Sequence, residues 1–157
     1  MDNHKFYEYG FDIVAKATLE NYRTVFNIIK VDKFFSYEFS LVKILDSCDI
    51  EAIKEFIEIT KNNYKELFRP SQDIMGTIST LLFIVPEVKS QDLNFIINFR
   101  YVRSFMLGLK GKYEIRIIFF DIKNKKVYTN KNAKVLRVYY EKLFKKGVVD
   151  GGMRGQV

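Results

Sequence analysis

The stretch KYEIRIIFFDIKNKKVY, from Lys112 to Tyr128, decides the fold that this sequence predicts. Its first half is a nearly unbroken run of β-branched and aromatic residues between Ile115 and Ile122. A strand with one solvated face alternates polar and apolar residues, so this run predicts a strand that is covered on both sides. Lysines around Asn124 interrupt the run, and Val127 resumes it. The stretch therefore predicts a β-hairpin with its turn near Asn124.

Asp121 ends the predicted strand, and its position is open to two interpretations. An acid at the end of a central strand can serve as a metal ligand or as a catalytic group. Aspartate is also a common turn residue, because its carboxylate accepts hydrogen bonds from the neighbouring backbone. Turn chemistry alone explains an aspartate at this point, so the sequence favours the turn.

The composition indicates one globular domain with a substantial core. The chain has 157 residues, of which 48% are hydrophobic, and only 2 Pro and 8 Gly. We expect the domain to span residues 1–146, followed by a flexible Gly-rich tail at 147–157. No apolar run approaches the ~20 residues of a membrane-spanning helix. The N-terminus also lacks the layout of a secretory signal, so a cytoplasmic protein is expected, either free or peripheral to a membrane.

Single copies of cysteine and histidine exclude several kinds of site. With Cys48 alone, no disulfide can form within the chain, and a zinc site built from cysteine and histidine lacks its ligands. A serine or cysteine nucleophile would have to recruit His4 from the chain terminus. We therefore expect a protein without enzymatic activity and without a cofactor.

Apolar periodicity supplies the other elements. Helices are predicted from Phe11 to Tyr22, from Ile50 to the Arg69-Pro70 break, from Ser90 to about Leu109, and from Lys131 to Lys146. Strands are predicted from Thr24 to Val31 and from Phe34 to Leu45, joined by a turn at Asp32-Lys33, and from Thr77 to Val85, besides the hairpin. The order α-β-β-α-β-α-β-β-α predicts an α/β (α+β) domain with a mixed sheet of about five strands flanked by about four helices.

The third predicted helix is apolar around nearly its whole circumference between residues 93 and 107. Such a helix needs cover on most sides. Burial against the sheet provides that cover, and so does a contact with a second copy of the chain. A homodimer through this helix is therefore one of two open interpretations.

Charge is distributed unevenly along the chain. The net charge is +7, but residues 1–109 carry −2 and residues 110–157 carry +9. The candidate anion-binding residues are Lys125, Lys126, Lys131, Lys134, Arg137, Lys142, Lys145 and Lys146. A basic face of this kind attracts a membrane surface, nucleic acid or an acidic protein, whereas an ordinary amphipathic helix with a Lys-rich solvated side is the alternative. The sequence favours a binding or accessory domain for an anionic partner.

A second candidate site is formed by Asp73 and the segment Glu87-Val88-Lys89. This pattern resembles that of the PD-(D/E)xK nuclease superfamily. The resemblance implies that Asp73 and Glu87 would hold Mg²⁺ or Mn²⁺, and that Lys89 would stabilise developing phosphate charge. The pattern is incomplete, because two residues separate Pro70 from Asp73 and Pro86 interrupts the motif strand. A metal-dependent nuclease with a degenerate site is the alternative to the binding domain.

Residues 116–144, RIIFFDIKNKKVYTNKNAKVLRVYYEKLF, carry a further resemblance. They are similar to the soluble N-terminal domain that precedes the membrane segments of some bacterial rhomboid-type intramembrane proteases. The likeness lies in the apolar strand, the Lys-rich turn and the returning Val127-Tyr128. The rhomboid Gly-x-Ser-x-Gly nucleophile is absent from this sequence, so no proteolytic residue is carried over. The resemblance implies an accessory domain beside a membrane surface.

Overall fold

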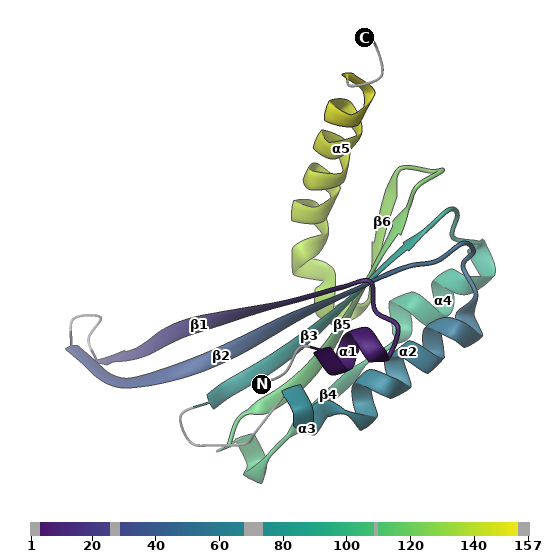
Figure 1. Ribbon diagram of the computed structural model, residues 1–157. Coiled ribbons are helices and arrows are strands. Elements are labelled where there is room, and N and C mark those ends of the chain that lie inside the picture. Colours follow the sequence, from purple (N-terminus) through teal and green to yellow (C-terminus); the bar gives the residue numbers. More distant parts are fainter. Residues whose placement is uncertain (1–3, 26–28, 68–73, 109, 154–157) are drawn as a thin grey trace.

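The computed structural model describes residues 4–25, 29–67, 74–108 and 110–153, which form a mixed sheet with helices on both of its faces (Figure 1). The strands are β1 (Ile13–Val25), β2 (Ile29–Ile44), β3 (Ile74–Val85), β4 (Tyr101–Ser104), β5 (Lys112–Asp121) and β6 (Lys126–Thr129). The helices are α1 (His4–Glu8), α2 (Ile50–Asn62), α3 (Tyr64–Leu67), α4 (Ser90–Asn98), η1 (Met106–Gly108), η2 (Lys131–Leu136) and α5 (Arg137–Met153). The predicted fold class, a mixed sheet flanked by helices, is confirmed.

The sheet has the strand order β1-β2-β3-β5-β4, and β6 pairs with β5 beyond this path. The pairs β2–β3 and β3–β5 are parallel, whereas β1–β2, β4–β5 and β5–β6 are antiparallel. Parallel neighbours need a crossover connection, and here α2 lies between β2 and β3 in the chain and α4 between β3 and β5. The sheet is therefore built from hairpins at its edges and crossovers at its centre.

The main core lies on the sheet face that α1, α2 and α4 cover. Alternate residues of the central strands point into it, with Phe39 and Leu41 on β2 fully buried. Phe83 of β3 stacks on Phe119 of β5, with ring centroids 5.1 Å apart. Asp49 caps the start of α2, because its carboxylate accepts the backbone N–H of Glu51 at 3.0 Å.

The second face of the sheet is covered only in part. Leu82 and Ile118 form a smaller core there with residues of β6, η2 and α5. Phe120 of β5 makes edge contacts with Tyr140 and Phe144 of α5, at 5.7 and 5.5 Å between ring centroids. This second cluster confirms that β5 is buried on both faces. Farther along the sheet, alanines of β1 remain exposed, so the β1–β2 part of this face is open.

The predicted hairpin is confirmed by the antiparallel pairing of β5 with β6. Lys125 in its turn adopts the left-handed conformation, with φ of 52°. The Asp121 carboxylate accepts the Asn124 backbone N–H and the Asn124 side-chain amide, both at 2.9 Å, and the Val88 backbone N–H at 3.1 Å. Asp121 therefore has the turn role that the sequence favoured.

The first predicted helix is wrong. Residues 13–25 form the edge strand β1, and only α1 precedes it. The spacing of three and four residues was misleading because Val14 and Thr18 lie on one face of this strand while Ala15 and Leu19 lie on the other. The predicted turn at Asp32-Lys33 is also wrong, since β2 runs through both residues and the chain reverses between Val25 and Ile29. Pairing with β2 decides the structure of this segment.

The third predicted helix divides into three elements, α4, β4 and η1. It ends at Asn98, and Phe99 has φ of −58° and ψ of 130°, which is extended backbone. The chain then enters β4, which pairs with β5 from Tyr101 to Ser104. Backbone pairing with the edge of β5 thus replaces the continuation of the helix in this segment. The continuous apolar helix that was expected to carry a dimer contact is therefore absent, and the homodimer itself remains a prediction.

The last predicted helix begins as the 3₁₀ segment η2 and continues as α5 to Met153. It thus passes Gly147, where the sequence predicted the end of the domain. The extra strand β4 and the short helix α1 raise the number of described elements above the prediction.

Candidate functional site

Asn130 fixes the start of η2 against the sheet. Its buried side-chain oxygen accepts the backbone N–H groups of Ile117 and Ala133, at 3.0 and 3.2 Å. Its amide nitrogen donates to the carbonyl of Phe99 at 3.2 Å. One side chain therefore ties together β5, the end of α4 and the first turn of η2. Asn130 thereby fixes the position of η2 and of the start of α5 on the sheet.

One hollow, of about 280 Å³, lies between the end of α4, the end of β6 and η2. We call it the basic hollow, and its lining residues are Ile97, Asn98, Thr129, Asn130, Lys131, Lys134 and Arg137. Lys131 and Lys134 form no ion pair with any residue that the structure describes. Arg137 donates through Nε to Glu141 at 2.8 Å. Three of the eight predicted cations thus line one hollow. Of these three, Arg137 is paired with a carboxylate, that of Glu141.

The other five predicted cations do not line this hollow. Lys125 lies in the β5–β6 turn and Lys126 begins β6, and both are exposed. Lys142, Lys145 and Lys146 are exposed on α5, where a rotation of 100° per residue puts them opposite the packed stripe of Tyr140 and Phe144. In Figure 1, α5 and the β5–β6 hairpin extend from the sheet as separate projections. The basic face therefore has one concave part and two outlying groups.

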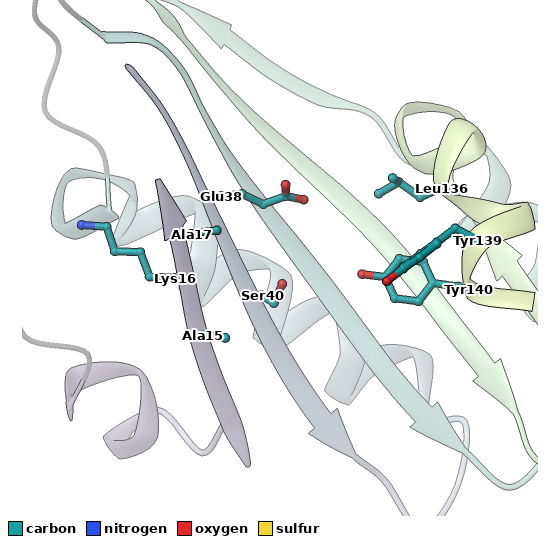
Figure 2. Close-up of a pocket in the computed structure, with 8 residues that line it drawn as sticks. All are labelled: Ala15, Lys16, Ala17, Glu38, Ser40, Leu136, Tyr139 and Tyr140. Atoms are coloured by element: carbon teal, nitrogen blue, oxygen red, sulfur yellow. The ribbon is translucent and has the colours of Figure 1, made fainter. Parts of the chain in front are cut away.

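A second hollow, of about 320 Å³, lies where η2 and α5 pass the open face of the sheet. We call it the open-face hollow, and its lining residues are Ala15, Lys16, Ala17, Glu38, Ser40, Leu136, Tyr139 and Tyr140. Figure 2 shows the Glu38 side chain on β2 and the two tyrosine rings on α5 lining the same space, while the Lys16 side chain points away. The Lys16 ammonium lies 4.7 Å from the ring centroid of Tyr37. Glu38 is thus the charged group that faces this hollow.

Glu38 belongs to a polar cluster on the open face. Its Oε1 accepts the Thr80 hydroxyl at 3.2 Å and lies 3.9 Å from a guanidinium nitrogen of Arg116. Arg116 donates through Nε to Glu114 at 3.0 Å. The sequence placed Glu38 only on the solvated side of a strand and did not single it out. No sequence signal joins β2 to α5, so the hollow could not be found without the tertiary structure.

The charge of Glu38 affects the pKa of Tyr140. Burial raises the pKa of the Tyr140 phenol, the negative charge of Glu38 and the neighbouring Tyr139 raise this pKa further, and Arg116 lowers it in part. The phenol therefore stays protonated at neutral pH and can donate a hydrogen bond. The open-face hollow combines an acceptor carboxylate with hydroxyl donors and aromatic rings.

The three residues of the nuclease alternative are not shown together. Asp73 lies outside the described residues. Glu87 is exposed and accepts the Lys123 ammonium at 2.7 Å, and the exposed Lys89 is the residue before α4. Within the described part of the chain, no three histidine, cysteine or acidic side chains are grouped as metal ligands. Glu87 thus takes part in a surface ion pair, Lys89 is exposed before α4, and the prediction about Asp73 stays a prediction.

Asp121, the other acid considered as a ligand, is committed to the hairpin. Burial alone raises the pKa of this carboxyl, but the hydrogen bonds from Asn124 and Val88 and the charge of Lys126 outweigh it, so the pKa lies below its ordinary value. The carboxylate is therefore ionised, and its oxygens accept hydrogen bonds from the hairpin and from Val88.

Cys48 has the properties of a structural thiol. Burial raises the pKa of its thiol to about 11, with a further contribution from the charge of Asp92 and a hydrogen bond to it. The thiolate is the nucleophilic form of cysteine, and it is scarce at neutral pH when the pKa is this high. The side chain is partly buried and forms no disulfide.

Comparison with known proteins gives one match. Residues 1–142 match the model of a protein family described as a domain of unknown function (DUF8052). No curated protein and no solved structure matches the chain. Among the described residues, no helix is both long and apolar enough to cross a membrane.

Proposed function

The chain belongs to the DUF8052 family, whose description gives no activity, and from the geometry we propose that it is a non-enzymatic binding domain for an anionic membrane surface. The basic hollow would take a lipid phosphate, and the cations outside it would add electrostatic attraction. The observation that carries this proposal is the convergence of Lys131, Lys134 and Arg137 on one hollow.

The hollow favours a discrete anionic group over diffuse attraction. The ammonium groups of Lys131 and Lys134 have no ion-pair partner among the described residues, and the Arg137 fork has donors beyond the Nε that Glu141 occupies. The Thr129 hydroxyl lies in the same lining. Charge-assisted hydrogen bonds from such groups match the oxygens of a phosphate.

Exposed aliphatic side chains beside these cations favour a bilayer over nucleic acid. Val135 is 80% exposed and Val138 is 60% exposed, and they flank Lys134 and Arg137 in the chain. Ile97, which lines the basic hollow, is 51% exposed. Aliphatic groups gain little beside a phosphodiester backbone, whereas near a bilayer they reach the boundary of the acyl region. The resemblance of residues 116–144 to a rhomboid accessory domain supports the same location.

Vesicle sedimentation tests this proposal. The full chain is mixed with phosphatidylcholine vesicles that contain about 30% phosphatidylserine, and with neutral vesicles as a reference. We expect much stronger binding to the anionic vesicles than to the neutral ones. Because each lysine near such a surface contributes about 1 kcal/mol, Lys131→Gln with Lys134→Gln is expected to weaken binding by roughly tenfold or more.

A charge-matched control separates the hollow from the net charge. Lys54 and Lys61 lie on α2 and pair with Glu51 and Glu58, at 2.6 and 2.5 Å. Lys54→Gln with Lys61→Gln removes the same charge and should leave vesicle binding almost unchanged. Equal losses in the two double variants, or tighter binding to single-stranded nucleic acid than to vesicles at equal salt, would refute the proposal.

A further inference from the structure

We propose that the open-face hollow binds an organic ammonium group, held between the rings of Tyr139 and Tyr140 and the carboxylate of Glu38. This site is independent of the basic hollow, and its ligand has the opposite charge. The nitrogen would carry alkyl substituents, because most of the side chains that line the hollow are aromatic or aliphatic.

The two tyrosines form two walls of an aromatic cage. Their ring centroids are 5.4 Å apart and their planes meet at 77°. Both rings line the hollow, so a group between them contacts two ring surfaces at once. Ring faces carry negative quadrupole charge and attract cations, and alkylated ammonium ions are weakly hydrated, so they lose little on entering.

Glu38 supplies the full charge of the site. The Thr80 hydroxyl and Arg116 both approach its Oε1. Among the described residues its Oε2 takes part in no hydrogen bond or ion pair, and Figure 2 shows the side chain on the side of the sheet where α5 lies. One carboxylate oxygen is therefore available to a cation in the hollow.

Arg116 does not cancel this charge. Its shorter contact, 3.0 Å from Nε, is to Glu114, whereas the distance to Glu38 is 3.9 Å. Glu114 has a second cationic partner, because its Oε2 lies 3.7 Å from the Lys112 ammonium, whereas the long contact to Arg116 is the one ion pair of Glu38 among the described residues. The Lys16 ammonium is turned away, toward the ring of Tyr37. A ligand in the hollow would therefore meet a carboxylate that its cationic partner approaches on one oxygen only, and this favours a cation over an anion.

The shape of the hollow suits a small ligand. Its volume of about 320 Å³ is at the lower end of the range for small-molecule sites. The methyl groups of Ala15 and Ala17 form a flat floor, and Leu136 closes the side beside the tyrosines. The hydroxyl of Ser40 is placed to accept or donate a hydrogen bond to a polar substituent. A choline-sized cation has a matching size and polarity.

Titration with choline, followed by NMR of the tyrosine ring signals, tests the proposal on the full chain. The matched probe is 3,3-dimethylbutan-1-ol, which has the shape of choline without its charge. We expect saturable shifts of Tyr139 and Tyr140 with choline and much weaker binding of the alcohol. Equal affinities for both probes would overturn the proposal.

Variants identify the groups that hold the cation. Tyr139 is 59% exposed, so Tyr139→Ala should keep the fold, and it is expected to weaken choline binding by roughly threefold or more. Tyr139→Phe keeps the ring and should retain most of the affinity. Glu38→Gln should also weaken binding by about threefold or more, whereas Glu55→Gln on the exposed side of α2 should not. Unchanged affinity in both Tyr139→Ala and Glu38→Gln would overturn the site.

The same chemistry can come from two sources, a free ammonium compound or a lipid headgroup. Vesicles of pure phosphatidylcholine provide the second arm. Retention on them that free choline competes away assigns the site to a headgroup, and binding of free choline alone assigns it to a soluble cation. Either result supports ammonium recognition. Failure in both arms would overturn it while leaving the basic hollow unaffected.

Discussion

The two hollows lie on opposite sides of the same short segment, residues 131–140, and present opposite chemistry. The basic hollow collects Lys131, Lys134 and Arg137. The open-face hollow collects Tyr139, Tyr140 and the carboxylate of Glu38. The three cations come first in this segment, the two tyrosines follow them, and the helical rotation lets the two groups line different hollows. The segment thus serves two sites because each side meets a different part of the sheet.

This comparison shows that net charge is a poor guide to a local site. The chain carries +7, and its last third is strongly basic, yet the hollow on the open face is lined by an acid. That acid comes from β2, which lies far from α5 in the chain. Long-range attraction follows the summed charge, whereas the sign of a bound ligand follows the few groups within contact distance.

Asn130→Ala is expected to have the largest effect, because it disrupts both hollows. The Asn130 side chain bonds the backbone of Ile117, Ala133 and Phe99, and its removal leaves buried groups unpaired. We expect a loss of about 2–4 kcal/mol in the free energy of unfolding, measured by urea denaturation. Asn98→Ala is the control, since among the described residues the exposed Asn98 amide bonds only Asn94 of its own helix. Equal stability of the two variants would contradict the role of Asn130.

Asp121→Asn should destabilise the β5–β6 hairpin more than the open-face hollow. The replacement puts an amide where the carboxylate accepts the Val88 and Asn124 donors, which should cost about 1–3 kcal/mol. Since the pKa of Asp121 is lower in the folded state, its stabilisation is complete above the ordinary pKa of 3.8 and is lost as the pH falls through the lower folded value. Acid titration followed by amide NMR should show β6 opening before the tyrosine signals change, and the variant should lack the Asp121 contribution to this pH dependence.

Salt should separate the two kinds of binding. Raising sodium chloride from about 50 mM to about 500 mM shortens the screening length severalfold, so binding to anionic vesicles should fall by roughly tenfold or more. Choline binding should change much less, because ring contacts carry part of it. Parallel salt titrations of the same sample measure both. An equal decline in both affinities would remove the distinction between the hollows.

The smallest expected effect is on the phenol of Tyr140. Glu38 contributes to the raised pKa of this group, so Glu38→Gln should lower that pKa toward its ordinary value, while the larger effect of burial remains. The carbon-13 signal of the Tyr140 ring over a pH titration reports this change. Glu55→Gln, on α2, should leave it unchanged. A Tyr140 pKa that is the same in wild type and Glu38→Gln would mean that the two groups are not coupled.

The parts of the fold that the sequence predicted are those where burial imposes a clear pattern. The apolar run in β5 predicts a strand covered on both faces because both of its sides are buried, and α2 is predicted from a single apolar face. In β1, by contrast, only Val14 is buried between Ile13 and Glu20, so its side chains show no clean period. The segment was mistaken for a helix for that reason.

The sequence by itself determined the mixed α/β sheet, the hairpin after Asp121 and the gathering of cations after residue 110, because local periodicity, turn chemistry and charge are properties of neighbouring residues. Only the tertiary structure decided that three of those cations converge on one hollow and that Glu38 faces two tyrosines across another. These arrangements depend on how η2 and α5 dock against strands distant in the chain. Such docking depends on packing between side chains that are far apart in the sequence, so no short stretch of sequence predicts it.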